Sequence, residues 1–238
     1  MALQHDFKAI FFDLDGTLVD IHGPLYIAIR RALGDLGHDQ PLTREHYQRA
    51  VERDDIYLGL PEDKRPECTK LAFAYFLTEI DRTERLEVLP HVQETLSEVK
   101  RRGYATAVIT SRPGDARRLV EKLAMVGLAA YFDQVITQTG STMSILDKTQ
   151  TLKQAAVRAA TTPRACMYVG DEPRDVMAAM NAGYGASVAV ATGPVSYRQL
   201  SGHPRYRPDH VMRSMGELIG LLERLKRASG GAGGSGDP

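Results

Sequence analysis

This sequence has little of several features that mark specialised classes of protein. Its 238 residues include no tryptophan and only 2 cysteines. Cys68 and Cys166 lie far apart and show no metal-ligand spacing, so they fit free thiols in a reducing compartment better than a disulfide framework. Because 30 basic residues balance 30 acidic ones, the net charge is zero. The composition therefore predicts no general attraction to nucleic acid or to an anionic membrane.

Long hydrophobic runs are also missing. The first residues, MALQHDFKAI, do not place a basic region before a long apolar stretch, and no segment approaches the length of a membrane span. We therefore expect a cytoplasmic protein that acts as a monomer or homodimer, without a nucleic-acid or membrane partner.

The sequence does contain short apolar runs that alternate with amphipathic helical patterns. Runs with little internal alternation are typical of parallel strands that are buried on both faces. This pattern predicts an α/β fold, a doubly wound parallel (Rossmann-like) sheet with helices on both faces. The expected strands lie within residues 8–14, 105–110, 133–137, 165–170, 187–192 and 209–212, and the expected helices within 92–103, 115–128, 149–160 and 175–183.

One segment interrupts this alternation. Between residues 20 and 87 the sequence has three helical patterns and no convincing strand. We interpret residues 20–87 as an inserted α-helical cap domain, and residues 1–19 and 88–228 as the α/β core domain. The chain ends in the glycine-rich stretch ASGGAGGSGDP, which starts at position 228. We expect residues 229–238 to form a disordered tail.

Carboxylates gather where the expected strands end. Asp13 and Asp15 follow the first strand in FFDLDGTL, and Asp171 and Asp175 follow the fourth in GDEPRD. Ligands of open α/β sheets bind at the carboxyl ends of the strands, so these groups should converge there. Oxygen ligands of this kind suit magnesium, which often holds a phosphate against one or two carboxylates. A carboxylate can also attack phosphorus itself, while a second one exchanges protons with the leaving group.

Three stretches, FFDLDGTLVD, AVITS and YVGDEPRD, together with a lysine between the last two, resemble the motifs of the haloacid-dehalogenase-like phosphatases. The resemblance covers nearly the whole chain and implies Mg²⁺, an aspartyl-phosphate intermediate, and Asp13 as the nucleophile with Asp15 as general acid and base. It also implies Thr110 as the hydroxyl that binds the phosphoryl group. The implied metal ligands are Asp13, Asp15, Asp171 and Asp175, with Asp171 the direct ligand and Asp175 in support.

The third motif departs from the pattern of the family. Members with this cap usually have proline after the motif lysine, whereas Thr149 follows Lys148 here. Lys148 is nevertheless assigned the role of offsetting charge between Asp13 and the phosphoryl group, because it begins a helical pattern at a suitable distance before GDEPRD.

The substrate is expected to be a small phosphorylated metabolite, such as phosphoglycolate, a sugar phosphate or a similar monoester. We expect five further positions to contact it: Gly16, whose turn can present backbone amides, the hydroxyl of Ser111, and Arg112, His22 and Arg53. Each of these residues is also compatible with an ordinary surface or loop role.

The sequence also bears on other activities of the same family. A haloacid dehalogenase would lack Asp15, and a phosphonatase would have a lysine in the first cap helix, where Arg30 and Arg31 stand instead. A phosphomutase of the β-phosphoglucomutase type shares both aspartates and the cap and stays an alternative. A binding module that keeps the fold without turnover is a second alternative, although no motif residue except the proline is missing.

Overall fold

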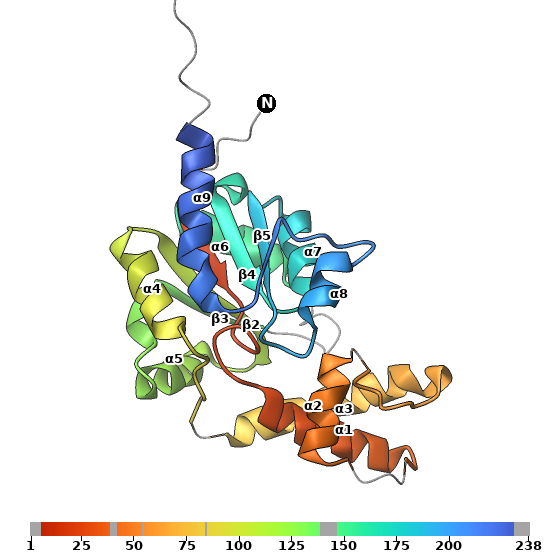
Figure 1. The fold of residues 1–238 in the computed structure, drawn as a ribbon. Helices are drawn as coiled ribbons and strands as arrows, with labels where there is room; N and C mark the ends of the chain where they lie inside the picture. Colours follow the sequence, from red (N-terminus) through yellow and green to blue (C-terminus); the bar gives the residue numbers. More distant parts are fainter. Residues whose placement is uncertain (1–5, 39–41, 54, 84, 139–146, 231–238) are drawn as a thin grey trace, which may run out of the picture.

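The centre of the molecule is a parallel sheet of six strands (Figure 1). The computed structural model describes residues 6–38, 42–53, 55–83, 85–138 and 147–230, and orders the strands β3-β2-β1-β4-β5-β6. They are β1 (Ala9–Phe12), β2 (Ala105–Pro113), β3 (Gln134–Gln138), β4 (Cys166–Gly170), β5 (Ala186–Val190) and β6 (His210–Met212). Because β1 lies between β2 and β4, the residues that follow it lie at the middle of the carboxyl edge, where ligands of such sheets bind.

Both faces of this sheet are buried. In β1, Ile10 and Phe12 belong to one hydrophobic cluster, whereas Phe11 belongs to the cluster on the opposite face. Every residue of β1 and β4 is buried, which explains why these strands read as unbroken apolar runs in the sequence.

Helices cover the two faces and complete three layers. Leucines of α5 (Ala116–Met125) and α9 (Leu218–Gly230) join α4 (Val92–Arg101) against the face that holds Phe12. The opposite face is covered by α6 (Thr149–Arg158) and α7 (Pro173–Ala182), and α8 (Tyr197–Gly202) packs beside β5. Gly183 ends α7 with a φ of 77°, a left-handed conformation that favours glycine.

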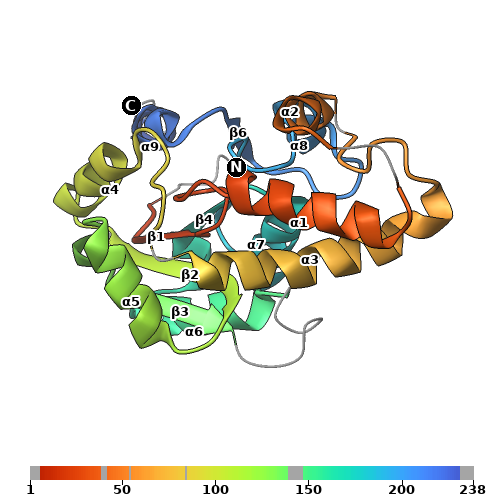
Figure 2. The same cartoon turned by 90° about the horizontal axis from the view of Figure 1, so that it is seen from below.

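The remaining helices form a separate group, which we call the helical block: α1 (His22–Asp35), α2 (Arg44–Glu52) and α3 (Arg65–Arg82). Figures 1 and 2 show α1 and α3 side by side next to the sheet. Their apolar side chains form hydrophobic clusters of their own, one around Leu33 and another around Phe76. The chain enters and leaves this block at one place, where the amide of Asp20 donates to the carbonyl of Glu87 at 2.8 Å.

The predicted doubly wound α/β fold is confirmed, with a strand in each of the six expected places. Several boundaries differ by one or two residues, and two differences are notable: β2 continues through Thr110 to Pro113, and α9 continues to Gly230, past the start of the predicted tail. Helical hydrogen bonding carries α9 those two residues further, and positions 231–238 of the predicted tail lie outside the described residues. None of the helices within the described ranges is long and apolar enough to cross a lipid bilayer.

Candidate active site

Asp13 lies at the carboxyl end of the central strand and is held there by its backbone. Its amide donates to the carbonyl of Val169 in the neighbouring strand β4 at 2.8 Å, and only 7% of the residue is exposed. A buried carboxylate needs a cationic or hydrogen-bonding partner. Asp13 has one in Lys148, whose Nζ lies 2.7 Å from Asp13 Oδ1.

Lys148 connects Asp13 with the acidic residues that follow β4. It precedes the first residue of α6 and is 2% exposed. Its Nζ donates to Asp175 Oδ1 at 2.9 Å and to the hydroxyl of Tyr168 at 3.2 Å. Burial lowers the pKa of Lys148, but the negative charges of Asp13 and Asp175 raise it by more, so the pKa is well above its usual value. The side chain is therefore a buried cation between two carboxylates.

Three buried carboxylates, those of Asp13, Asp171 and Asp175, form a compact cluster of oxygen atoms. One oxygen from each lies within 4.8 Å of the others. Burial raises the pKa of Asp13 to about 7, against the lowering effect of Lys148 and with raising contributions from Asp175 and Asp15. The pKa of Asp171 is also raised, first by burial and then by its acidic neighbours. Such a cluster is expensive to ionise unless a cation joins it.

Two glycines make room for Asp171. Its Oδ2 is buried and has no hydrogen-bond partner within the described part of the chain. A Cβ atom on Gly193 would lie 1.7 Å from that oxygen, and one on Gly16 would lie 2.2 Å from it. Gly16 also has a φ of 77°, which side chains rarely adopt. The backbone at Gly16 and Gly193 thus approaches Asp171 Oδ2 so closely that no side chain would fit at either position.

Asp15 belongs to a second group, formed with strand β2. Arg112 Nη2 donates to Asp15 Oδ1 at 2.6 Å, and Arg112 Nε donates to Asp15 Oδ2 at 2.9 Å. The hydroxyl of Thr110 donates to Asp15 Oδ2 at 3.3 Å and accepts from the amide of Arg112 at 3.1 Å. The irregular register of β2 between Ile109 and Pro113 accompanies this turn of the strand end toward Asp15. Both oxygens of Asp15 are therefore engaged.

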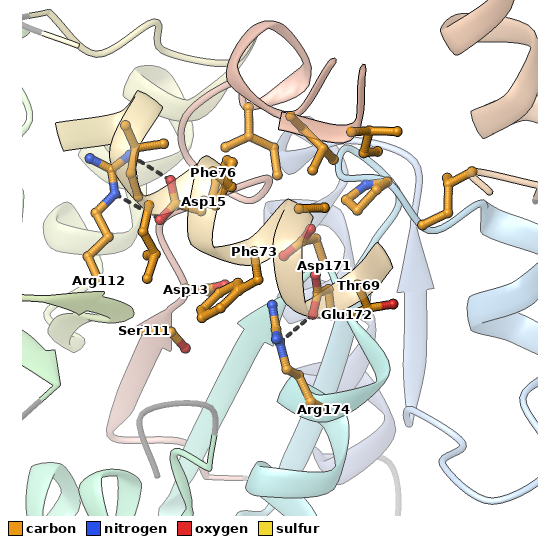
Figure 3. Close-up of a pocket in the computed structure, with 18 of the residues that line it drawn as sticks. Asp13, Asp15, Thr69, Phe73, Phe76, Ser111, Arg112, Asp171, Glu172 and Arg174 are labelled. Carbon is orange, nitrogen blue, oxygen red and sulfur yellow. Dashed lines mark hydrogen bonds and ion pairs between the residues drawn. The ribbon is translucent and has the colours of Figure 1, made fainter. Parts of the chain in front are cut away.

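These groups open into one cavity of about 250 Å³ between the sheet and the helical block (Figure 3). The sheet side supplies polar and charged groups, and a second ion pair, Arg174 with Glu172, lies there next to Asp171. The helical block supplies mainly apolar side chains. The lining residues are Asp13, Asp15, Ile21, Leu25, Ile29, Ile56, Tyr57, Cys68, Thr69, Ala72, Phe73, Phe76, Leu77, Ile80, Thr110, Ser111, Arg112, Asp171, Glu172, Arg174 and Pro194.

Of the residues expected to contact the substrate, Ser111 and Arg112 line the cavity, but their hydrogen-bonding states differ. Ser111 lines the cavity, and its buried Oγ has no hydrogen-bond partner among the described residues. Arg112 lines the cavity too, but its guanidinium is paired with Asp15. The amide of Gly16 donates to the carbonyl of Val19 at 2.9 Å, so what Gly16 provides here is space for Asp171.

His22 and Arg53 are not brought to this cavity. His22 Nδ1 lies 3.0 Å from the hydroxyl of Tyr47, in a separate depression on the helical block. Arg53 follows the last residue of α2 and is exposed. The charged residues next to Arg53 in the sequence are typical of a helix end that faces solvent.

Sequence reasoning missed two parts of the site. Arg174 and Glu172 lie within the GDEPRD stretch, so their closeness to Asp171 and Asp175 was a signal for them. The apolar wall, which includes Phe73 and Phe76, had no such signal. Its residues follow the same helical spacing as core positions, and only the position of the helical block shows that they face a cavity.

Comparison with known proteins places this architecture among relatives. The family model described as haloacid dehalogenase-like hydrolase matches residues 10–190. The pyrophosphatase PpaX of Bacillus velezensis is 30% identical over 215 residues, which cover 89% of this chain and 94% of the relative. The phosphoglycolate phosphatase of Synechococcus elongatus is 30% identical over 227 residues, covering 92% and 99%. In structure, a haloacid dehalogenase-like family hydrolase from Streptococcus pneumoniae shares the fold, with a TM-score of 0.64, 20% identity and coverage of 91% and 99%.

Proposed function

This chain belongs to the haloacid dehalogenase-like hydrolases, and on that premise we propose that it is a magnesium-dependent phosphatase of small phosphorylated metabolites that works through an aspartyl-phosphate. The observation that carries the proposal is the position of Asp13. The Asp13 carboxylate lies at the end of the central strand, 2.7 Å from the buried Nζ of Lys148 and in one cluster with the carboxylates of Asp171 and Asp175. Relatives named as phosphatase and pyrophosphatase support phosphoryl chemistry at this site.

The residues present fit a divalent metal ion. Asp171 offers a buried oxygen without a hydrogen-bond partner in the described chain, and Asp13 lies in the same cluster. Asp175 is engaged by Lys148 and by the amide of Glu172, which suits a supporting role. These ligands are all hard oxygens, as magnesium prefers. The side chain of Asp15 is bound to Arg112, so any contribution of Asp15 to the metal comes from its backbone. The ion would supply positive charge that offsets the phosphoryl oxygens.

The first chemical step is assigned to Asp13 and Asp15. A carboxylate oxygen of Asp13 attacks phosphorus, and the bond from phosphorus to the ester oxygen breaks. Asp15 in its acid form donates its proton to that oxygen, so the product leaves as an alcohol. The hydroxyls of Thr110 and Ser111 line the cavity and can hold the phosphoryl oxygens, and Lys148 offsets charge next to Asp13.

The second step regenerates the enzyme. Water attacks the phosphorus of the aspartyl-phosphate, and Asp15, now a carboxylate, accepts a proton from that water. The bond between phosphorus and the Asp13 oxygen breaks, which releases inorganic phosphate and restores the Asp13 carboxylate. Transfer to a sugar hydroxyl in place of water would give the phosphomutase alternative, which differs only in the acceptor.

The helical block is assigned as the cap over this site, within residues 20–87. It contributes one wall of the cavity and is connected to the rest of the chain at a single place, beside Asp20. A wall of this kind excludes water from the reacting groups and positions the leaving group.

Release of phosphate from 4-nitrophenyl phosphate tests the proposal. We expect turnover that requires Mg²⁺ and stops with EDTA, and a hydroxylamine-sensitive phosphoenzyme in rapid-quench experiments with labelled substrate. Asp13→Asn should abolish the phosphoenzyme and lower kcat by several orders of magnitude, on the order of the loss when a nucleophile is removed. Turnover that persists in EDTA, or at more than about a tenth of the normal rate in Asp13→Asn, would overturn the proposal.

A further inference from the structure

The wall that faces the reacting carboxylates carries no charge in the described chain. All cavity-lining residues between positions 20 and 87 are uncharged, and most are aliphatic or aromatic, including Leu25, Phe73 and Phe76. The hydroxyl of Tyr57 lies 2.8 Å from Thr69 Oγ1, which itself donates to the carbonyl of Arg65 at 3.0 Å. The two hydroxyls on this wall are therefore already hydrogen-bonded.

The cations on the opposite side of the cavity are paired. Arg112 binds both oxygens of Asp15, and Arg174 forms an ion pair with Glu172. Lys148 lies behind the cavity between Asp13 and Asp175. Within the described chain, no cation that lines the cavity is left for a second anionic group of the substrate.

This arrangement penalises the leaving groups of the compounds that the relatives are named for. The carboxylate of phosphoglycolate and the second phosphate of pyrophosphate would face the apolar wall without a partner. An anion that is buried without a partner is strongly unfavourable, because it loses its hydration and gains no opposite charge. Sugar hydroxyls would also lose their bonds to water there.

Phe73 shows that the wall is available to a substrate. It is half-buried in α3 and lines the same cavity as Asp13, and both are labelled in Figure 3. It is absent from the hydrophobic clusters formed by the described residues, unlike Leu71, which packs against the cluster around Leu33. The ring of Phe73 therefore offers its apolar surface to the cavity.

We propose that the substrate of this site is a phosphate monoester of an uncharged apolar alcohol, an aryl or alkyl phosphate, whose organic group packs against Phe73, Phe76 and Leu25. The inference rests on the proposed function for its chemistry and adds the identity of the leaving group. Burial of the apolar surface of the organic group supplies the binding free energy.

The test compares substrates whose leaving groups are all primary alcohols: benzyl phosphate, glycerol 3-phosphate and phosphoglycolate, with pyrophosphate as a fourth compound. We expect kcat/KM for benzyl phosphate to exceed the other values by about tenfold or more. Phe73→Ala should lower kcat/KM for benzyl phosphate about tenfold more than for glycerol 3-phosphate. The control Leu71→Ala removes a side chain from the same helix outside the cavity, and should change both substrates by the same factor.

Binding of inert analogues separates this inference from the proposed function. Calorimetry with benzylphosphonate and phosphonoacetate should show tighter binding of benzylphosphonate, and Phe73→Ala should remove the difference. A protein that hydrolyses none of the four compounds contradicts the proposed function, whatever the binding result. Efficient hydrolysis of phosphoglycolate or pyrophosphate relative to benzyl phosphate, or tighter binding of phosphonoacetate, overturns the inference on the leaving group.

Discussion

Arg112 holds both carboxylate oxygens of Asp15, at 2.6 Å through Nη2 and at 2.9 Å through Nε. Such a fork-like pair fixes the orientation of the carboxylate as well as its charge. Asp15 is the residue proposed to exchange a proton with the leaving group and then with water, so Arg112 determines where that exchange takes place.

Replacement of Arg112 should thus affect proton transfer more than phosphoryl binding. We predict that Arg112→Ala lowers kcat by on the order of tenfold to a hundredfold for alkyl phosphates, whose leaving groups need a proton, and by less for 4-nitrophenyl phosphate. Arg112→Lys keeps one charge but loses the fork, so it should recover only part of the rate. Steady-state kinetics with both substrates measures the split, and a loss that is equal for the two would indicate a general structural role.

Asp15→Asn tests the proton transfer directly. The amide is similar in size but cannot exchange the proton, so the loss in kcat should be larger for poor leaving groups. The structure adds a second expectation: because the side chain of Asp15 lies outside the carboxylate cluster, Mg²⁺ should stabilise Asp15→Asn against heat as it does the unaltered protein. Equal losses for aryl and alkyl phosphates would count against the assigned role.

The sheet and the positions of most polar residues at its carboxyl edge could be predicted from the sequence. Strands buried on both faces become unbroken apolar runs, and the carboxylates that follow β1 and β4 must then meet, because parallel strands end at one edge. The position of Lys148 before a helix predicts its place in the site, and in the structure its Nζ lies 2.7 Å from Asp13 Oδ1.

The pairing of Arg112 and the apolar wall could not be predicted in this way. Arg112 is one of many arginines, and nothing in the adjacent residues distinguishes a guanidinium that binds Asp15 from one that binds substrate. Phe73 follows the helical spacing of buried residues, but whether such a position faces a core or a cavity depends on tertiary packing. Arg53 is the opposite case: its charged stretch suggested a contact with the substrate, but the residue lies exposed at the end of α2.

The stability of the metal-free protein should depend on pH through the carboxylate cluster. The pKa of Asp13 is raised to about 7 and that of Asp171 is raised too, whereas an unfolded chain has aspartate pKa values of about 3.9. The folded state therefore binds more protons than the unfolded state between these values, and its stability falls as the pH rises through that window. In EDTA we predict a Tm that falls by several °C between about pH 5 and pH 8, since 1 kcal/mol corresponds to roughly 2–4 °C at this size.

Mg²⁺ should reverse this trend, because protons and the metal compete for the same oxygens. The rise in Tm on addition of Mg²⁺ is predicted to be larger at about pH 8 than at about pH 5. Asp171→Asn serves as the reference: it removes one buried charge, so its Tm in EDTA should be higher at about pH 8 and respond little to Mg²⁺. The prediction fails if the curves of the two proteins in EDTA have the same slope across this window.

Gly193 provides a test of the metal site that leaves every carboxylate in the chain. A Cβ at this position would lie 1.7 Å from Asp171 Oδ2, so Gly193→Ala must displace that carboxylate from Asp13 and Asp175. Gly16→Ala would have a similar effect but is confounded by a φ of 77°, whereas Gly193 has no left-handed backbone.

We predict that Gly193→Ala raises the Mg²⁺ concentration for half-maximal activity about tenfold or more, as expected when a metal ligand is displaced. Gly202→Ala, whose Cβ would meet nothing within 4 Å, is the matched control and should leave that concentration unchanged. If the two variants respond to Mg²⁺ alike, Asp171 does not hold the metal.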